Sequence, residues 1–204
     1  MASPNDRSAL LGGLATPSLA VVLLVVFAVE AATGAAGDEV ALLRMGALSD
    51  DGSLGHEYWR LITYSFLHLT SLHLLLNLAL LWWVGRIVER RVGGLLMYAA
   101  YFLAVIIAGV SIVAAHLNAP RPGSSMGASG GVFGLLACAL ILMRRRDAAQ
   151  FMTSTRVQLW LWIVLLAALG ASLLPGVSLA GHVGGLIGGT IAGIALPVRQ
   201  PSRT

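Results

Sequence analysis

Six long apolar runs, separated by short polar or charged segments, divide the chain. Each run is close to the roughly 20 residues that an α-helix needs to cross the hydrocarbon core of a bilayer. Glycine and proline gather in the gaps, and no sequence repeat of roughly 20–50 residues occurs, which favours a single bundle. The pattern predicts an all-α polytopic membrane protein, a bundle of six transmembrane helices. The predicted spans are 17–33, 71–87, 95–115, 128–143, 157–174 and 179–198.

Composition agrees with a membrane protein. Of the 204 residues, 57% are hydrophobic and 11% are charged, whereas a soluble domain carries roughly 25% charged residues. All 13 basic residues are arginines, and the formal net charge is +4. A basic chain can indicate a nucleic-acid partner, but these arginines sit in short clusters between apolar runs and form no continuous patch. We therefore expect the lipid bilayer, and no nucleic acid, as a partner.

The arginines also predict the topology. With both termini in the cytoplasm, ten of the 13 arginines fall in inside segments and three in outside segments, as the positive-inside rule requires. The sequence thus predicts a cytoplasmic N-terminus (1–16), a six-helix domain (17–198) and a cytoplasmic C-terminal tail (199–204). The inside arginines are Arg7, Arg86, Arg90, Arg91, Arg144, Arg145, Arg146, Arg156, Arg199 and Arg203; the outside ones are Arg44, Arg60 and Arg121.

The segment before the second span mixes apolar residues with charges. We expect residues 34–70 to form a structured loop at the outer interface, not a separate domain. Residues 31–35 (Ala-Ala-Thr-Gly-Ala) resemble a signal-peptidase site. However, Asp6 beside Arg7 leaves the preceding segment without net side-chain charge, which is atypical of a signal peptide. We expect the first span to be a retained anchor.

A few polar side chains lie inside the predicted spans, where they are costly and mark function by default. Two of them, Glu30 and Glu89, lie near the ends of their helices, and we expect both to reach the membrane interface. The others lie deeper. The full set is Glu30, His73, Asn77, Glu89, Ser129 and His182.

Four of these polar residues share one depth. Ser129 and His182 lie 15 and 17 residues before the arginine at the inner end of their helices, and His73 and Asn77 lie 17 and 13 before theirs. At about 1.5 Å per residue, all four fall in one layer near the outer edge of a core about 30 Å thick. His73 and Asn77 are four residues apart and therefore share a helix face.

Glycines flank two of the four. Small residues at Gly130 and Gly134, and again at Gly181, Gly185 and Gly189, would let the fourth and sixth helices approach closely. Close packing would also bring Ser129 within hydrogen-bond reach of His182. Spacing alone therefore does not distinguish a packing motif from a reactive pair. We expect valine at position 185 to be damaging and alanine to be much milder.

Several motifs together resemble the rhomboid intramembrane serine proteases. The resemblance covers the chain from about residue 56 to 195, and its motifs occur in the family's order on six spans of the expected orientation. Each motif alone is weak, and their combination is specific. They are Trp59-Arg60, then His68, His73 and Asn77, then Gly85 to Arg90, Gly127-Ala128-Ser129-Gly130, and Gly181-His182-Val183-Gly184-Gly185.

The resemblance implies peptide-bond hydrolysis in or near transmembrane segments of protein substrates, without a cofactor or metal ion. Ser129 would be the nucleophile and His182 the general base, forming a dyad. The oxyanion would be bound by the Ser129 backbone N–H and by the side chains of Asn77 and His73. The dyad fits the sequence, because no acidic residue follows Asp147. Where the family often has tyrosine four residues after the nucleophile, this chain has Phe133.

Two other classes of function stay open at this stage. One is a catalytically inactive rhomboid-like protein that binds membrane segments, against which the presence of both Ser129 and His182 argues. The other is a small transporter or channel, disfavoured because no acid lies in the polar layer and no internal repeat is found. The arginine-only, alanine- and glycine-rich composition is typical of a GC-rich bacterium, which predicts the bacterial plasma membrane. Natural substrate and oligomeric state stay open.

Overall fold

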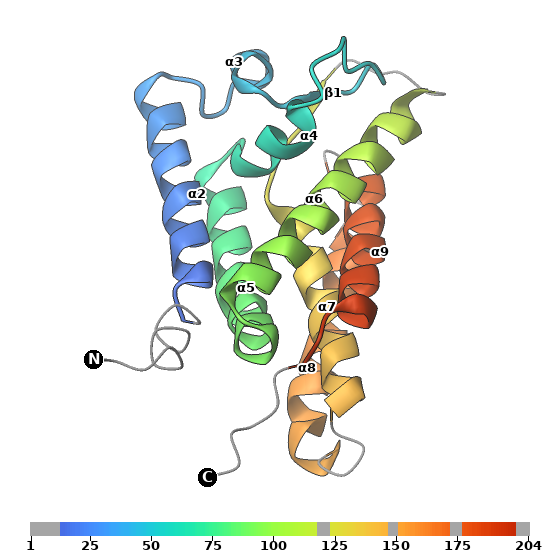
Figure 1. Cartoon of the computed structure of the whole chain (residues 1–204). Helices are drawn as coiled ribbons and strands as arrows, with labels where there is room; N and C mark the ends of the chain where they lie inside the picture. The colour runs from blue at the N-terminus through green and yellow to red at the C-terminus, as the bar shows by residue number, and fades with distance from the viewer. Residues whose placement is uncertain (1–12, 118–122, 147–150, 172–176, 199–204) are drawn as a thin grey trace, which may run out of the picture.

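The computed structural model describes residues 13–117, 123–146, 151–171 and 177–198. Within them the chain is an all-α polytopic membrane protein with a helix at each of the six predicted ranges (Figure 1). These helices are α2 (Ala15–Ala32), α5 (Ser71–Val92), α6 (Gly94–Leu117), α7 (Ser129–Arg146), α8 (Phe151–Ala171) and α9 (Leu179–Ala195). The tail 199–204, Asp147, Arg7, Arg121, Arg199 and Arg203 lie outside the described residues, as do residues 1–12 of the predicted N-terminal segment.

Among the described residues, α2, α5 and α6 are long and apolar enough to cross a membrane, and α9 is a shorter apolar helix of 17 residues. The predicted count of six spans remains a prediction. Helix α5 extends five residues beyond the predicted end at residue 87 and finishes at Val92. Glu89, in the charged last turns of α5, is stabilised by hydrogen bonds from the start of α2, which allows the helix to continue.

The loop 34–70 carries secondary structure of its own. It contains α3 (Glu39–Met45), β1 (Leu48–Ser49), α4 (Arg60–Thr63) and the short 3-10 helix η1 (Tyr64–Phe66), and it lies over one end of the bundle (Figure 1). Strand β1 pairs antiparallel with β2 (Ser124–Ser125), directly before α7. Arg60 braces the loop, because its guanidinium donates to the carbonyls of Leu43 and Ala47 at 2.5 and 2.8 Å.

Helix α7 is the centre of the bundle. Its residues from Gly130 to Leu140 are all buried, and it packs against α9, α6 and α5 (Figure 1). The closest approach is to α9. A Cβ added at Gly185 or Gly189 would collide with the carbonyl oxygens of Gly130 and Gly134 respectively. The predicted close packing of the fourth and sixth helices is therefore present.

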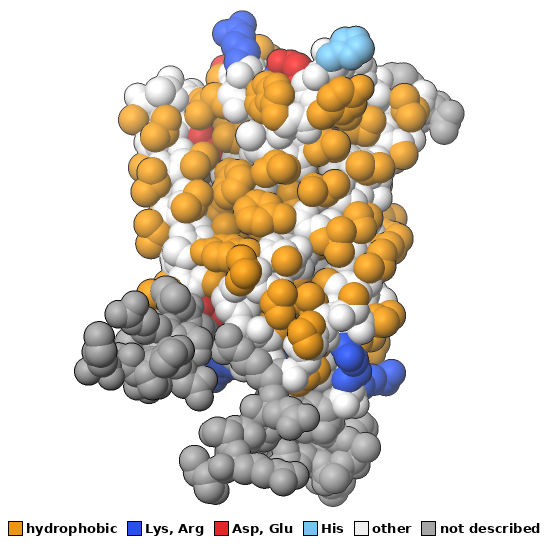
Figure 2. Space-filling model, in the orientation of Figure 1, with side chains coloured by type: hydrophobic (Ala, Val, Ile, Leu, Met, Phe, Trp, Pro, Cys, Tyr) orange, Lys and Arg blue, Asp and Glu red, His pale blue; other side chains and the backbone are white. Residues whose placement is uncertain are grey.

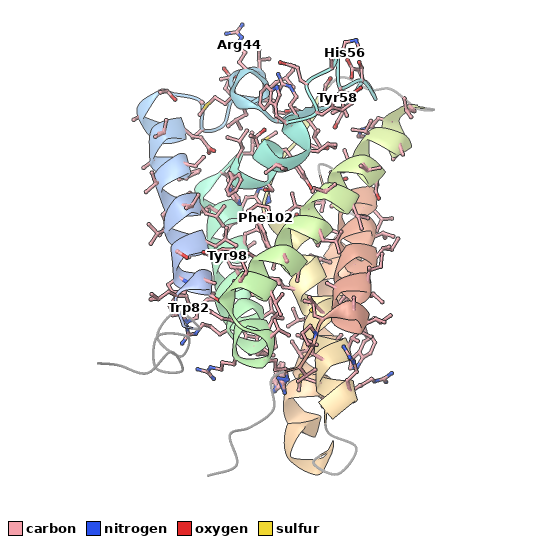
Figure 3. All side chains as sticks on the ribbon, viewed as in Figure 1. Arg44, His56, Tyr58, Trp82, Tyr98 and Phe102 are labelled. Atoms are coloured by element: carbon pink, nitrogen blue, oxygen red, sulfur yellow. The ribbon has the colours of Figure 1, made fainter. Side chains whose placement is uncertain are left out.

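The outer surface of the bundle is apolar around its middle. Figure 2 shows hydrophobic side chains over the central band and charged side chains near the two ends. In Figure 3, Arg44, His56 and Tyr58 lie at the end that carries α3, and Trp82 lies near the opposite end. On α8, Trp160 and Trp162 are exposed. This distribution fits a helix bundle surrounded by lipid.

The expectation that Glu30 and Glu89 reach the interface is wrong, because both side chains are fully buried. The Glu89 carboxylate caps the start of α2. It accepts the backbone N–H groups of Ala15 and Thr16 at 2.7 and 3.2 Å and the Thr16 hydroxyl at 2.7 Å. The first N–H groups of a helix have no partner within the helix, and a carboxylate there is favourable. Glu89 therefore joins α5 to α2.

Candidate active site

Ser129 is the first residue of α7 and follows a sharply constrained segment of backbone. Gly127 adopts φ +126°, a conformation that L side chains rarely adopt, and its N–H donates to the Tyr64 carbonyl at 2.9 Å. A Cβ at Gly127 would also lie 2.8 Å from His73 Nε2. Glycine is thus required here by conformation and by space. The result is a half-buried serine at a helix N-terminus, where backbone N–H groups favour negative charge.

His182 lies in the first turn of α9. Ser178 caps this helix by accepting the Gly181 N–H at 3.2 Å, and His182 is 7% exposed. Its Nε2 lies 2.9 Å from Ser129 Oγ, a normal hydrogen-bond distance. The Phe133 ring stacks on the imidazole with 4.0 Å between centroids and 9° between planes. Phe133, four residues after Ser129, therefore packs on the His182 ring.

Glycine packing brings Ser129 and His182 together. Gly130 and Gly185, which follow them by one and three residues, form one of the backbone contacts between α7 and α9. A Cβ on either glycine would meet atoms of a neighbouring helix. The packing motif and the serine–histidine pair are thus two aspects of one contact.

His73 and Asn77 lie on α5, facing the same space. Thr70 caps α5 by accepting the His73 N–H at 3.2 Å, which places His73 in the first turn. The Asn77 amide donates to the His73 carbonyl at 3.0 Å, and its side chain is buried. The structure therefore brings all four predicted site residues to one place.

These four residues line one cavity of about 1050 Å³. Its wall beside them is apolar on the side of α5 and α8, where Leu76, Trp83 and Val164 contribute. On the side of β2 it is polar. Glu39, Asp50, Ser124 and Ser125 line that polar side.

Burial suppresses charge on two residues of the loop that contacts the site. Burial, and secondarily nearby His73, lower the pKa of His68 to about 4. Burial raises the pKa of Tyr64, whose hydroxyl donates to the Val105 carbonyl at 2.8 Å. In the described part of the chain, no group of three or more His, Cys, Asp or Glu side chains is arranged to hold a metal ion.

The pKa of His68 predicts a pH-dependent stability. Because folding lowers this pKa from 6.5 to about 4, the unfolded chain binds the proton more tightly. The stabilisation is complete above about pH 6.5 and is lost as the pH falls towards 4. Over that window we expect the parent to lose roughly 3 kcal/mol more than His68→Gln. Melting curves in detergent from pH 7.5 to 4 measure the difference; parallel curves for the two proteins would contradict it.

The model of the rhomboid domain matches residues 55–199 of this chain. The chain belongs to the rhomboid family. The match includes all four site residues and begins within the loop that precedes α4.

Several curated rhomboid relatives match most of this chain. Rhomboid protease GluP of Bacillus subtilis is 32% identical over 179 residues, which are 87% of this chain and 34% of the relative. RHOMBOID-like protein 4 of Arabidopsis thaliana is 34% identical over 147 residues, 71% of this chain and 36% of the relative. Rhomboid protease GlpG of Klebsiella pneumoniae (strain 342) is 30% identical over 122 residues, 60% of this chain and 42% of the relative. The rhomboid chain thus spans between a third and a half of these relatives' length.

Two further residues border this site, Glu30 and His68, and the sequence assigned neither of them a role there. Glu30, expected at the interface, places both carboxylate oxygens 3.3 Å from the His68 backbone nitrogen, which donates to them. His68 is fully buried and contacts the backbone directly before Ser129. Both contacts involve backbone N–H groups, which are the same for nearly every residue type. For Glu30, the signal available in the sequence was an acidic residue within an apolar run, which marks function by default.

Proposed function

We propose that this chain is an intramembrane serine endopeptidase that hydrolyses peptide bonds in or near transmembrane segments of protein substrates. The observation that carries the proposal is the 2.9 Å contact between Ser129 Oγ and His182 Nε2. This pair lines a cavity with an apolar wall of α5 and α8 residues. An apolar wall suits a transmembrane segment, and the serine–histidine pair suits acyl transfer.

The chemistry uses Ser129 and His182 in two half-reactions. Ser129 Oγ attacks the scissile carbonyl carbon while its proton passes to His182 Nε2. Collapse of the tetrahedral intermediate breaks the C–N bond, and His182 returns the proton to the leaving amine. In the second half-reaction, a water molecule gives its proton to His182 and attacks the ester. Ester cleavage then releases the carboxyl product and restores the Ser129 hydroxyl.

The oxyanion of each intermediate is stabilised by preorganised donors. The Ser129 N–H is at the N-terminus of α7, and the Asn77 and His73 side chains approach from α5. Because α7 and α5 are held rigidly by packing and by the Thr70 cap, the donors need little reorganisation as charge develops. Asn77 and His73 are therefore assigned to oxyanion stabilisation, and Ser129 and His182 to bond making and proton transfer.

The proposed topology has six spans in residues 17–198, with both termini cytoplasmic, in a bacterial plasma membrane. The orientation is supported by the ten-to-three distribution of arginines between the two sides. The bacterial membrane is supported by the arginine-only, alanine- and glycine-rich composition. Trp82, near the end of the bundle opposite α3 (Figure 3), stacks with Arg86, 5.9 Å from the ring centroid, as expected at an inner interface. The loop 34–70 and the active site then lie towards the outer face, where substrates are cut.

Reconstitution tests the proposal. The purified chain is placed in liposomes with each of several single-span membrane proteins, and the products are identified by mass spectrometry. We expect one cleavage in or near the span. A panel of such substrates that binds the protein but stays intact would instead support the inactive, segment-binding rhomboid-like alternative.

Asn77→Ala is expected to slow catalysis without abolishing it. The loss of one oxyanion donor should lower kcat by on the order of 10²-fold, with a smaller effect on KM because the donor acts on developing charge. Steady-state kinetics in the same liposomes measure both constants. An unchanged kcat with a raised KM would reassign Asn77 to substrate positioning.

A further inference from the structure

His68 is a buried side chain that the proposed chemistry does not use. It follows η1 in the loop before α5, and none of its surface is exposed. Its Nδ1 lies 3.3 Å from the Phe66 carbonyl oxygen, and its Nε2 lies 3.5 Å from the Ala128 backbone nitrogen. A carbonyl accepts and an N–H donates, so both contacts are satisfied together by the neutral ring with its proton on Nδ1.

The position of the His68 ring is fixed from two directions. Its backbone N–H donates to the buried Glu30 carboxylate of α2. Its ring packs edge-on against His73, with 5.0 Å between centroids. The imidazole is therefore a rigid acceptor that faces the Ala128 N–H.

Ala128 has a particular place in the backbone. Its carbonyl accepts the Val132 N–H at 3.0 Å, the first helical bond of α7, which makes it the N-cap residue. In a capping box, a Glu or Gln three residues later accepts the N-cap N–H. That position is Gly131 here, which has no side chain to do so. His68 supplies the acceptor from a distant part of the chain.

The peptide between Ala128 and Ser129 carries the Ser129 N–H that the proposed oxyanion site uses. Its orientation depends on the backbone angles of Ala128, which are limited when the N–H and the carbonyl of Ala128 are both held. On the other side, Gly127 lies against His73 and donates to the Tyr64 carbonyl. The segment 127–128 thus lies against two imidazole rings, with Gly127 next to His73 and Ala128 next to His68.

We propose that His68 is a positioning residue: by accepting the Ala128 N–H, it orients the backbone that presents the Ser129 N–H to the oxyanion. This inference rests on the proposed protease function. A hydrogen bond of 3.5 Å contributes little to folding stability, but catalytic contacts of free enzymes are commonly long and tighten during the reaction. Loss of the His68 acceptor therefore lowers mainly kcat.

The test compares three substitutions at one position. In His68→Gln the amide oxygen reaches the place of Nε2, so the acceptor is kept. In His68→Asn the shorter side chain reaches only the place of Nδ1, so the acceptor is lost while polarity stays. His68→Leu fills the space without an acceptor. His56→Asn is the control, because His56 is an exposed outer-loop histidine with φ +67°, which asparagine tolerates.

Each protein is assayed for substrate cleavage and for the rate of Ser129 labelling by a fluorophosphonate, well below its melting temperature. We expect His68→Gln and His56→Asn to stay within about threefold of the parent, and His68→Asn and His68→Leu to lose on the order of 10- to 100-fold in kcat and labelling rate, with KM little changed. If His68→Leu does not fold, the Gln and Asn variants carry the comparison.

The outcomes separate the two proposals. Equal activity of the Gln and Asn variants, or full activity of His68→Leu, overturns the positioning role while the protease assignment stands. A rise in KM at constant kcat also overturns it. A parent protein that neither cleaves substrate nor reacts with the fluorophosphonate overturns the protease assignment, and the role of His68 with it.

Discussion

Ser129→Ala is expected to abolish cleavage of a transmembrane substrate, lowering the rate by on the order of 10⁴-fold or more, and His182→Ala is expected to do the same. Alanine removes the nucleophile in the first variant and the proton acceptor 2.9 Å from it in the second. The two residues act as one unit, so the double variant should be no slower than either single one. Rates measured in liposomes under single-turnover conditions test this.

Folding is the necessary control for these variants. Ser129 is half-buried at a helix start, and Ser129→Ala removes only its hydroxyl. The melting temperature of this variant should therefore stay close to that of the parent. His182→Ala removes a stacked ring beside Phe133, and His182→Gln is therefore the better-packed comparison. Appreciable cleavage by folded Ser129→Ala would show that another group is the nucleophile.

Gly185→Val is expected to lose both stability and activity. A Cβ at this position would collide with the Gly130 carbonyl oxygen and lie 2.9 Å from the Gly130 carbonyl carbon. Backbone atoms cannot rotate aside as a side chain can, so α9 must move away from α7. Overpacking costs about 1–3 kcal/mol or more, and a shift near 1 Å between Ser129 and His182 can cost on the order of 10² in rate.

The same geometry corrects the expectation that alanine at position 185 is mild. Alanine already has the Cβ that meets Gly130, so Gly185→Ala should lower the melting temperature and the cleavage rate as well. Gly170→Ala on α8 is the matched control, because nothing lies within 4 Å of its added Cβ. Melting curves and cleavage assays on the same preparations test the set. Gly185→Ala behaving like Gly170→Ala would exclude close packing as the cause of the Ser129–His182 contact.

The sequence predicted the helices and the site in different degrees of detail. The helical ranges followed from apolar runs of membrane length. The common depth and flanking glycines of Ser129 and His182 allowed the two to meet, and the resemblance to the rhomboid proteases implied that they do. Those signals work because a bilayer sets helix length and because glycine permits close approach. The contact that a Cβ at position 185 would make with the Gly130 backbone was not predicted, since spacing indicates that two helices approach but not which atoms touch.

The environment of the two acids Glu30 and Glu89 was also predicted wrongly, because both are buried. Glu30 and Glu89 lie near helix ends, which suggested contact with water, yet the partners of both include backbone N–H groups. Ala15 lies 74 residues from Glu89, and His68 lies 38 from Glu30. A backbone donor has no residue-type signature, so such pairs become visible only in three dimensions. The contact of His68 with the Ala128 N–H was hidden for the same reason.

The most direct test of the central claim is the site of covalent labelling. The purified parent protein is treated with a fluorophosphonate and digested, and the adduct is located by mass spectrometry. The account predicts one adduct, on Ser129, that forms much more slowly in His182→Gln because the base is absent. An adduct on a different residue, or none on a protein that is folded, would contradict the assignment of Ser129 and His182 as the catalytic pair.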